Sequence, residues 1–485
     1  MKKNMNDANY ISAYIDGKWR CNESDYFSLS RPQDNRIAGR RFGNARIQDL
    51  TDALAAARTG QARWQHTPIM ERGKALTRAA AFIRNEAGKI VQELHTEAGK
   101  PLGESEAEVA TAAEFLDTFA HWAQWGAHGA LRHAKGRVLT EKRPRGIAAL
   151  ITPWNYPISN PCQKLGAALI AGNAVIWRPS GLTPACSVAL ARAFEHADIP
   201  PGVFNFFLEK GDTLSKRLIE STEIQAVSFT GSTRVGLQIA AAATARGAAV
   251  QCEMGGKNAA IVMPDADIQH AAERIAFGAF SFAGQKCTAL SRVLVHRDII
   301  DAFHDALDRA RAPYQCVSAQ QINANCAPLI TRAQHRKLLT TISTLNLRGL
   351  KIAQGGEAPS PQELAHGNYI EPTVLAADDT HDRVWTEELF GPVLLSAPFT
   401  HLSNAVESVN HNPYGLAAAI FTDSSKSIQF AIDHLDVGVL KINEATPGLD
   451  PYSPAGGWKQ SGLGPNELTE DGVEFFSRKK AIYLG

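Results

Sequence analysis

The sequence lacks the features that mark several specialised classes of protein. Its 485 residues include 50 lysines and arginines against 49 aspartates and glutamates, a formal net charge of +1, and no dense basic block that would fit nucleic acid. No apolar run approaches the about 18 residues of a membrane-spanning helix. The start, MKKNMNDANY, has no apolar segment of a signal peptide after its lysines. We therefore expect a cytoplasmic protein that binds neither nucleic acid nor membrane.

Cysteine is scarce and irregularly placed. The 7 cysteines are Cys21, Cys162, Cys186, Cys252, Cys287, Cys316 and Cys326. Without CxxC spacing they are a poor basis for a disulfide framework or a zinc site, so neither is expected. Most cysteines in such a chain are small buried side chains. Cys287 differs, because GQKCTA places it between Lys286 and Thr288, directly after the apolar run 276–283.

What the chain does contain is an alternation of helical and strand patterns. Residues 47–125 are mostly helical in pattern, with amphipathic runs at 50–63 and 74–86. Strands are then predicted at 146–151, 174–177, 203–207 and 226–229, separated by helices near 161–170, 185–196 and 212–220. Strands joined by such helices pair in parallel, which predicts an α/β doubly wound sheet. The pattern begins again after Gly256, and the chain is too long for one core, so a second α/β domain is expected.

Three polar clusters follow predicted strands, at the edge where doubly wound sheets bind ligands. They are TPWNYP at 152–157, RPSG at 178–181 and TGSTRVG at 230–236. In the third cluster, Gly231 allows close backbone approach, and the hydroxyls of Ser232 and Thr233 at a helix N-terminus suit a phosphate. The dinucleotide motif GxGxxG is absent, and a plain helix cap by Ser232 or Thr233 explains these residues equally well.

Eight ordered motifs resemble those of the NAD(P)-dependent aldehyde dehydrogenase superfamily, nearly end to end. They are GKP (99–101), PWNYP (153–157), FTGST (229–233), EMGGK (253–257), GQKC (284–287), EELFGPV (387–393), NPYGL (412–416) and GGWKQSG (456–462). The resemblance implies two doubly wound domains, a Rossmann-like cofactor domain and a catalytic domain, plus a β-strand oligomerisation arm. We expect the cofactor domain in 1–125 and 145–255, the catalytic domain in 256–455, and the arm and tail in 126–144 and 456–485.

The resemblance also implies a mechanism. Cys287 matches the nucleophile, whose thiolate adds to the aldehyde so that a hydride can leave and a thioester forms. The side-chain amide of Asn155, otherwise a turn residue by composition, and the backbone N–H of Cys287 match the oxyanion donors. Glu253 matches the base that activates water for thioester hydrolysis. Lys286 either supports the thiolate or points away from it.

A set of further positions resembles the binding site for NAD or NADP. These are Thr152, Trp154, Lys164, Arg178, Ser180, Gly181, Gly231, Ser232, Gly255, Glu388 and Phe390. Glu388, Phe390 and Lys164 match residues around the nicotinamide and its ribose. Arg178 replaces the usual lysine, and Gly181 stands where many NAD-preferring members carry a glutamate, which would leave open space. A guanidinium suits a 2′-phosphate and a carboxylate would repel it, so we expect NADP to be accepted well and NAD to remain usable.

The substrate follows less directly from the sequence. GQKCTA looks most like the branch that oxidises 2-oxoglutarate semialdehyde and related short semialdehydes. Gln163 stands where succinic-semialdehyde-type members carry an arginine, and Pro465-Asn466 alters the usual turn before Glu467. An aromatic or sugar-derived aldehyde is the alternative substrate, and a CoA-acylating or non-catalytic member is a further alternative. The presence of Glu253 favours hydrolysis over transfer to coenzyme A.

The strand 136–143 and the tail 473–484 are expected to form the oligomerisation arm. Open-edged strands are a liability in a monomer and usually pair with another subunit, so we expect a homodimer or homotetramer.

Overall fold

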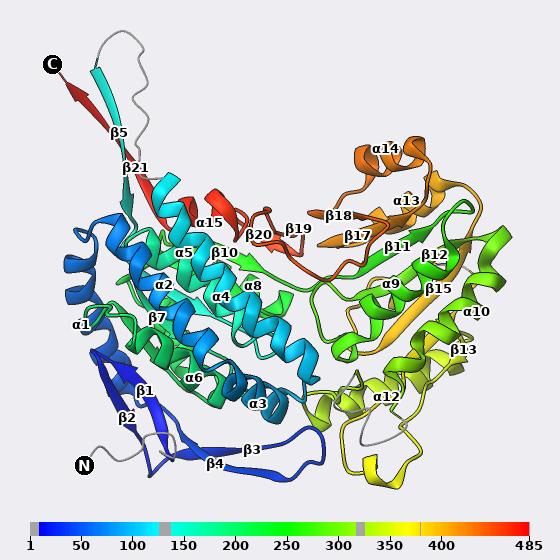
Figure 1. The fold of residues 1–485 in the computed structure, drawn as a ribbon, viewed down its shortest axis with the longest axis horizontal. Coiled ribbons are helices and arrows are strands. Elements are labelled where there is room, and N and C mark those ends of the chain that lie inside the picture. The colour runs from blue at the N-terminus through cyan, green and yellow to red at the C-terminus, as the bar shows by residue number, and fades with distance from the viewer. Residues whose placement is uncertain (1–8, 126–136, 317–324, 379, 485) are drawn as a thin grey trace.

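The computed structural model describes residues 9–125, 137–316, 325–378 and 380–484. Figure 1 shows two lobes, each built around one sheet, and an arm of β5 (Arg137–Pro144) and β21 (Ser477–Leu484) that projects from the first lobe. The chain passes from one sheet to the other between β10 (Ala249–Glu253) and β11 (Asn258–Val262). Among the helices of these ranges, none combines the length and the apolar character needed to cross a membrane.

The first sheet has eight strands in the order β2-β1-β8-β7-β6-β9-β10-β20. Its parallel centre consists of β6 (Ile147–Ile151), β7 (Ala174–Arg178), β8 (Phe204–Phe207), β9 (Ile224–Thr230) and β10. Numbered along the chain, this is the 3-2-1-4-5 order of a dinucleotide-binding sheet. Every residue of β6 is buried, because helices cover both faces of a parallel sheet.

The connecting helices confirm the sequence pattern. They are α5 (Ser159–Ile170), α6 (Pro184–Glu195), α7 (Thr213–Glu220) and α8 (Thr233–Thr244). The helical region before them consists of α1 (Ile47–Trp64), α2 (Ile69–Asn85), α3 (Ala87–Ala98) and α4 (Leu102–Trp125). Helix α5 packs closely on α4, since a Cβ at Gly166 would lie 2.5 Å from the ring of Phe119.

Antiparallel strands extend both edges of the first sheet. At one edge, β1 (Ile11–Ile15) pairs with β8 and with β2 (Lys18–Cys21). The hairpin of β3 (Tyr26–Ser30) and β4 (Ile37–Gly43) follows. At the other edge, β20 (Gly462–Leu463) pairs with β10 and sets Gly462 opposite Glu253. The C-terminal region therefore joins the first sheet beside a predicted catalytic residue.

The second sheet has seven strands in the order β13-β14-β15-β12-β11-β17-β18. Its strands are β13 (Lys351–Gln354), β14 (Thr373–Ala376), β15 (Val393–Phe399), β12 (Leu290–His296), β11, β17 (Ala417–Phe421) and β18 (Val439–Ile442). All neighbours pair in parallel except β13 with β14. The main helices around this sheet are α9 (Ile268–Phe280), α10 (Ile300–Arg311), α12 (Arg332–Leu347), α13 (Leu402–Asn410) and α14 (Ser425–His434). The predicted second α/β unit is confirmed.

The arm is a two-stranded antiparallel ribbon within one chain. Its pairing runs from Arg137 opposite Leu484 to Pro144 opposite Ser477. The predicted strand is confirmed from 137 onward, and residues 126–136 of the predicted arm lie outside the described residues. The tail begins as a helix, α15 (Thr469–Phe475), and becomes a strand only at Ser477. Because the ribbon has two strands, each strand keeps one edge free of pairing within the described chain.

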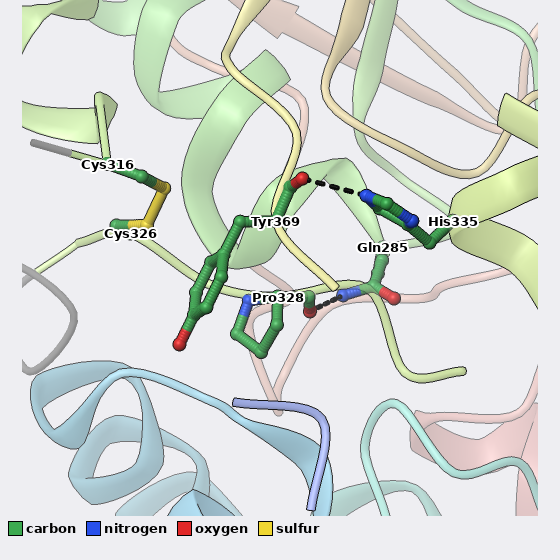
Figure 2. The surroundings of a disulfide bond; sticks show 6 residues. All are labelled: Gln285, Cys316, Cys326, Pro328, His335 and Tyr369. Atoms are coloured by element: carbon green, nitrogen blue, oxygen red, sulfur yellow. Dashed lines mark hydrogen bonds between the residues drawn. A yellow bond between two sulfur atoms is a disulfide. The ribbon is translucent and has the colours of Figure 1, made fainter. Parts of the chain in front are cut away.

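The chain contains a disulfide that the sequence analysis did not expect. Cys316 follows the 3-10 helix η4 (Ala312–Tyr314), and its sulfur is bonded to that of Cys326 across a Cα separation of 5.4 Å (Figure 2). The expectation was wrong because a spacing of 10 residues does not show whether the chain returns to its starting point. The remaining cysteines, Cys21, Cys162, Cys186, Cys252 and Cys287, are free thiols.

Candidate active site

Cys287 lies in a tight loop between the 3-10 helix η2 (Ser281–Gly284) and β12. Three successive residues before it are left-handed, with φ of 48° at Phe282, 51° at Ala283 and 64° at Gly284. Gly284 has no room for a side chain, because a Cβ there would lie 2.8 Å from the Ala279 carbonyl oxygen. Left-handed non-glycine residues cost about 1–3 kcal/mol each and cluster at functional sites. The surrounding structure must therefore hold this loop in place.

The side chain of Gln285 provides one of these restraints. It is fully buried; its amide nitrogen donates to the Pro328 carbonyl oxygen at 3.0 Å (Figure 2), and its oxygen accepts the Ile330 N–H at 2.9 Å. The backbone carbonyl of Gln285 accepts a hydrogen bond from the side-chain amide of Asn155 at 3.0 Å. Gln285 thus ties the Cys287 loop to the 328–330 segment on one side and to Asn155 on the other.

Lys286 points away from the thiol into its own ion pair. Its ammonium nitrogen lies 2.7 Å from the Glu104 carboxylate and 2.7 Å from the Ser281 hydroxyl. The side chain is only 4% exposed. Of the two alternatives from the sequence, the structure selects the one in which Lys286 anchors the loop and its charge is neutralised by Glu104.

On the β12 side, the loop is fixed by Asn258 at the start of β11. The Asn258 amide donates to the carbonyl oxygens of Cys287 and Ala289, at 2.8 Å each. Gly256 passes so close that a Cβ would lie 2.7 Å from the Cys287 carbonyl oxygen. The glycine of EMGGK is therefore required for the close approach of the two motifs.

Asn155 lies in the turn after β6 and is buried. Its carbonyl oxygen accepts a hydrogen bond from the Lys100 ammonium at 2.7 Å, and Lys100 in turn forms a buried ion pair with Glu108. The Glu108 carboxylate also accepts the backbone N–H groups of Ile158 and Ser159, at 2.9 and 3.2 Å. Buried charges need partners, and Lys100 and Glu108 find theirs in each other and in the backbone of this turn. Lys100 of the GKP motif therefore holds the turn that carries the predicted oxyanion donor.

Glu253 ends β10 and faces the same space. One carboxylate oxygen accepts the Gly457 N–H at 3.1 Å, a contact made possible by the pairing of β10 with β20. Burial first, and the nearby Glu467 carboxylate second, raise the pKa of Glu253 well above its usual range, while Lys164 and the Gly457 N–H oppose the shift. Burial and a neighbouring carboxylate thus favour the protonated form of this carboxyl group.

Lys164 is buried in a polar network beside Glu253. Its ammonium group is ion-paired with Glu467 and lies 2.9 Å from the Ser228 hydroxyl. The Gln163 amide donates to the other Glu467 oxygen at 3.1 Å. The ammonium group of Lys164 is therefore occupied within the protein, and Gln163 faces Glu467.

Sequence reasoning missed the position of Glu467. The altered turn before it rests on β10, where the Gln251 amide donates to the carbonyl oxygens of Pro465 and Asn466 at 3.0 and 2.9 Å. The departure at Pro465-Asn466 was the available signal, but nothing local shows which strand the turn contacts.

The pKa shift of Cys287 shows that Glu253 and Glu388 lie near its thiol. Burial raises the pKa of the Cys287 thiol to about 12, with further upward contributions from the Glu253 and Glu388 carboxylates. The Thr288 N–H acts in the opposite direction. The structure therefore brings Cys287, Glu253 and Glu388 together, in surroundings that favour the protonated thiol.

Glu388 is held against the EMGGK motif. Its carboxylate accepts the Gly256 N–H at 3.1 Å, and a Cβ at Gly255 would collide with it. Burial raises the pKa of Glu388 to about 7. Phe390, at φ 53°, packs its ring edge-on against Trp154 with centroids 5.8 Å apart. Both side chains thus lie where the glycine motif, the β6 turn and the Glu388 segment meet.

The N-terminus of α8 has free donors. Ser232 occupies the cap position but makes no side-chain capping bond, and the buried Thr233 hydroxyl has no hydrogen-bond partner within the described residues. The simple capping alternative is therefore wrong. A Cβ at Gly231 would lie 2.6 Å from the Phe229 ring, so the turn stays narrow. Uncapped N–H groups and free hydroxyls at a helix N-terminus fit the phosphates of a dinucleotide.

At the carboxyl end of β7, Arg178 turns toward the loop after β8. Its guanidinium donates to the Gly211 carbonyl, and its Nε lies 3.9 Å from the Glu209 carboxylate without a hydrogen-bond partner in the described chain. The side chain is 16% exposed. A Cβ at Gly181 would lie 2.6 Å from the Glu209 carbonyl oxygen. The expectation that Gly181 leaves open space was wrong, because the backbone of Glu209 fills it.

Two other predicted cofactor residues serve the local fold. The Thr152 hydroxyl accepts the Trp177 indole N–H at 2.9 Å and is buried. The Ser180 hydroxyl accepts the Leu182 N–H at 3.2 Å and shapes the turn. Their side chains position the edge at which the dinucleotide-binding sheet ends.

Comparisons with known proteins show the family to which the chain belongs. A model of the aldehyde dehydrogenase family matches residues 19–482. The alpha-ketoglutarate semialdehyde dehydrogenase of Haloferax volcanii is 32% identical over 478 residues, which cover 97% of this chain and 98% of the relative. The alpha-ketoglutaric semialdehyde dehydrogenase of Bacillus subtilis is 31% identical over 484 residues, which cover 99% of both.

Solved structures show the same fold. Betaine aldehyde dehydrogenase from Staphylococcus aureus in complex with NAD+ matches with a TM-score of 0.92 and 29% identity, over 98% of this chain and 95% of that one. A 3,6-anhydro-L-galactose dehydrogenase in complex with NAP matches with a TM-score of 0.93 and 28% identity, over 99% of this chain and 100% of that one. The α/β fold and the resemblance found in the motifs are confirmed. The chain belongs to the aldehyde dehydrogenase family and is an NAD(P)-dependent oxidoreductase that acts on an aldehyde.

Proposed function

We propose that this enzyme oxidises a small semialdehyde with a carboxylate end, and that 2-oxoglutarate semialdehyde is the best single candidate. The observation that carries the proposal is the near full-length similarity to two proteins named alpha-ketoglutarate or alpha-ketoglutaric semialdehyde dehydrogenase. Gln163 faces Glu467 and carries no charge, which argues against a simple succinic semialdehyde enzyme. Because Lys286 is paired with Glu104, other donors would have to bind the carboxylate end of the substrate.

In the proposed first half-reaction, Cys287 is the nucleophile. Burial raises the pKa of its thiol, so the thiol must first lose its proton to solvent before the sulfur can attack. As sulfur adds to the aldehyde carbon, negative charge develops on the oxygen. The side-chain amide of Asn155 and the backbone N–H of Cys287 are the proposed donors to that oxygen. The bound nicotinamide supplies the acceptor for the hydride that leaves as the thioester forms.

In the proposed second half-reaction, Glu253 activates water. The Gly457 N–H holds one of its oxygens, and burial raises its pKa, so the carboxylate is a stronger base than an exposed glutamate. Water then attacks the thioester, the carbon–sulfur bond breaks, and Cys287 is released with a carboxylate product. The proximity of Glu253 to the thiol supports hydrolysis over transfer to coenzyme A.

The proposed dinucleotide site uses residues that fit the group. The hydroxyls at the α8 N-terminus would face the phosphates, Glu388 would hold the nicotinamide ribose, and Arg178 would lie near the adenosine ribose. We propose that both NADP and NAD are used. The unpartnered Nε of Arg178 supports a phosphate contact, whereas the Glu209 carboxylate beside it weakens one.

The substrate proposal is tested with purified enzyme and a panel of aldehydes, each with both cofactors. We expect the highest kcat/KM for 2-oxoglutarate semialdehyde or a close carboxylated analogue. A preference for benzaldehyde-type substrates over every carboxylated semialdehyde would overturn the proposal. A sugar-derived aldehyde is the second candidate, favoured by the structural match to 3,6-anhydro-L-galactose dehydrogenase, and it belongs in the same panel.

We further propose a homodimer or homotetramer in the cytoplasm. The two-stranded arm supports the assembly proposal, because its outer edges are open to a second subunit. Sedimentation at micromolar concentration should show a species of twice or four times 52.4 kDa. A profile with only the single-chain species would contradict the assembly, and cell fractionation tests the compartment.

A further inference from the structure

The Cys316–Cys326 disulfide lies in a small apolar cluster of its own. Both cysteines are at most 2% exposed and are grouped with Leu364 and Tyr369. The carboxylate of Glu371 accepts the backbone N–H of Cys316, which adds a polar contact on the α10 side of the bond. The disulfide therefore fixes the start of the segment 326–330 to a buried part of the second lobe.

This segment leads directly to the Cys287 loop. Two residues after Cys326, the Pro328 carbonyl accepts the Gln285 amide, and two residues further on, the Ile330 N–H donates to the same side chain. Between them, the Leu329 N–H donates to the Asn368 carbonyl at 2.9 Å. Figure 2 shows the disulfide, Pro328 and Gln285 within one close-up of the structure. Because the buried Gln285 side chain is hydrogen-bonded to two points of this short segment, a displacement of the segment would also displace Gln285.

Gln285 also contacts Asn155, the proposed oxyanion donor. Its backbone carbonyl accepts one hydrogen of the Asn155 side-chain amide at 3.0 Å, which sets the orientation of that amide. The thiol that attacks the aldehyde lies two residues after Gln285. A change in the 326–330 segment would therefore reach both the nucleophile and the donor through a single side chain.

We propose that the Cys316–Cys326 disulfide is a redox-sensitive positioning element of the active site, acting through Gln285 on Asn155. The proposal rests on the proposed role of Asn155 as oxyanion donor. With the bond formed, the 326–330 segment is restrained and the amide of Asn155 is held for catalysis. With the bond reduced, the segment gains freedom, the two bonds to Gln285 weaken, and the chemical step slows.

The redox step is an ordinary thiol–disulfide exchange. A small dithiol of the dithiothreitol class attacks one of the two sulfurs, the S–S bond breaks, and a mixed disulfide forms. The second thiol of the reagent then displaces the protein sulfur and leaves as a cyclic disulfide, so that two electrons and two protons pass to Cys316 and Cys326. Because both sulfurs are buried, the reaction requires local opening of the segment.

The test compares the oxidised and dithiothreitol-reduced forms of the full-length enzyme. The denatured, unreduced chain should give five reactive thiols, seven cysteines minus the two in the bond. Reduction should give seven and should lower the rate constant of the pre-steady-state burst by about 2- to 30-fold. The KM for the dinucleotide should change by less than about twofold, because neither Gln285 nor the 326–330 segment is among the proposed cofactor-binding residues.

Variants separate positioning from general stability. The double substitution Cys316→Ser with Cys326→Ser should have the slow burst and no longer respond to dithiothreitol. The matched control Cys21→Ser, at an exposed free thiol, should respond as the wild type does. Gln285→Met removes both side-chain bonds to the segment, so its burst should be slow in either redox state.

Three outcomes would overturn the inference. These are seven thiols before reduction, an unchanged burst rate after complete reduction, or a fall in thermal stability alone with kinetics intact. Asn155→Ala distinguishes these from failure of the mechanism. If it keeps the wild-type burst rate, the assigned role of Asn155 is wrong. If it is slow while reduction has no effect, only the inference about the disulfide fails.

Discussion

The Cys287 loop and the dinucleotide edge of the first sheet differ in how far their polar groups are already paired. Around Cys287, the side chains of Gln285, Lys286 and Asn258 all have hydrogen-bonding partners within the chain. At the edge, the Nε of Arg178 and the hydroxyl of Thr233 are buried and lack one among the described residues.

This difference indicates how each region works. Buried polar groups are nearly always paired, so an unpaired one calls for an explanation such as an absent ligand. The Cys287 loop has its geometry fixed without substrate, which suits a site where small misplacements slow chemistry. At the edge, the unpaired polar groups fit the dinucleotide site that we propose. Substitutions in the loop should therefore affect rate constants, and substitutions at the edge should affect cofactor affinity.

The sharpest test of the loop is removal of its thiol. Cys287→Ala should lower kcat by at least about 10⁴-fold, because the covalent route needs the sulfur. The measurement is the aldehyde-dependent rise in reduced nicotinamide absorbance, including the first turnover. Cys21→Ala is the matched control, since Cys21 is an exposed free thiol outside the site, and it should keep full activity. A normal first turnover in Cys287→Ala would contradict the assignment.

Glu253→Gln should separate the two half-reactions. The amide cannot activate water, so turnover should fall by about 10²–10⁴-fold while a burst of reduced cofactor remains. Rapid mixing with a full cofactor load measures both phases. Equal losses of burst and turnover would show that Glu253 is needed before the thioester forms, and the assigned role as hydrolytic base would be wrong.

The pH profile should reflect the environment of Glu253. Only the ionised form accepts a proton from water, and burial together with Glu467 raises its pKa, so kcat should fall about tenfold per pH unit below that raised pKa. Removing the neighbouring charge with Glu467→Gln should lower the pKa of Glu253. The acid limb of kcat should then move to lower pH, and a limb that stays in place would argue against the coupling.

The smallest expected effect lies at the dinucleotide edge. Arg178→Ala should raise the Kd for NADP by about 10- to 160-fold, the range expected when a charge-assisted hydrogen bond of about 1.5–3 kcal/mol is lost. The Kd for NAD should change little, because it carries no 2′-phosphate. Fluorescence titration with both cofactors measures the two values. Equal losses would mean that Arg178 shapes the loop through Gly211 and does not read the phosphate.

Much of this architecture could be predicted from local patterns. The strands β6, β7, β8 and β9 are short apolar runs separated by amphipathic helices, and such runs indicate a parallel sheet by themselves. The N-terminal strands were not predicted, because β1 becomes a strand by pairing with β8, some 190 residues later by its register of Ala13 with Phe207. Long-range pairing of this kind leaves no local signal.

Within the site, the sequence indicated which residues carry the chemistry, but it did not show which residues they contact. Cys287, Glu253 and Asn155 were proposed from motifs, and the structure brings them to one place. The partner of Lys164 and the close approach of Glu209 to Gly181 could not be predicted. Each depends on where a segment distant in sequence packs. Gly181 seemed to leave space for a ligand, but the structure shows that it makes room for the backbone of Glu209.

The pairing of β20 with β10 has a consequence for how this enzyme can be altered. The last 30 residues, 456–485, supply the N–H that holds Glu253, the carboxylate of Glu467 and the outer strand of the arm. If the proposed assembly and the proposed role of Glu253 are right, both depend on this one continuous piece of chain. Replacing this tail with that of another family member would then change the contacts of the arm and the surroundings of Glu253 in a single step.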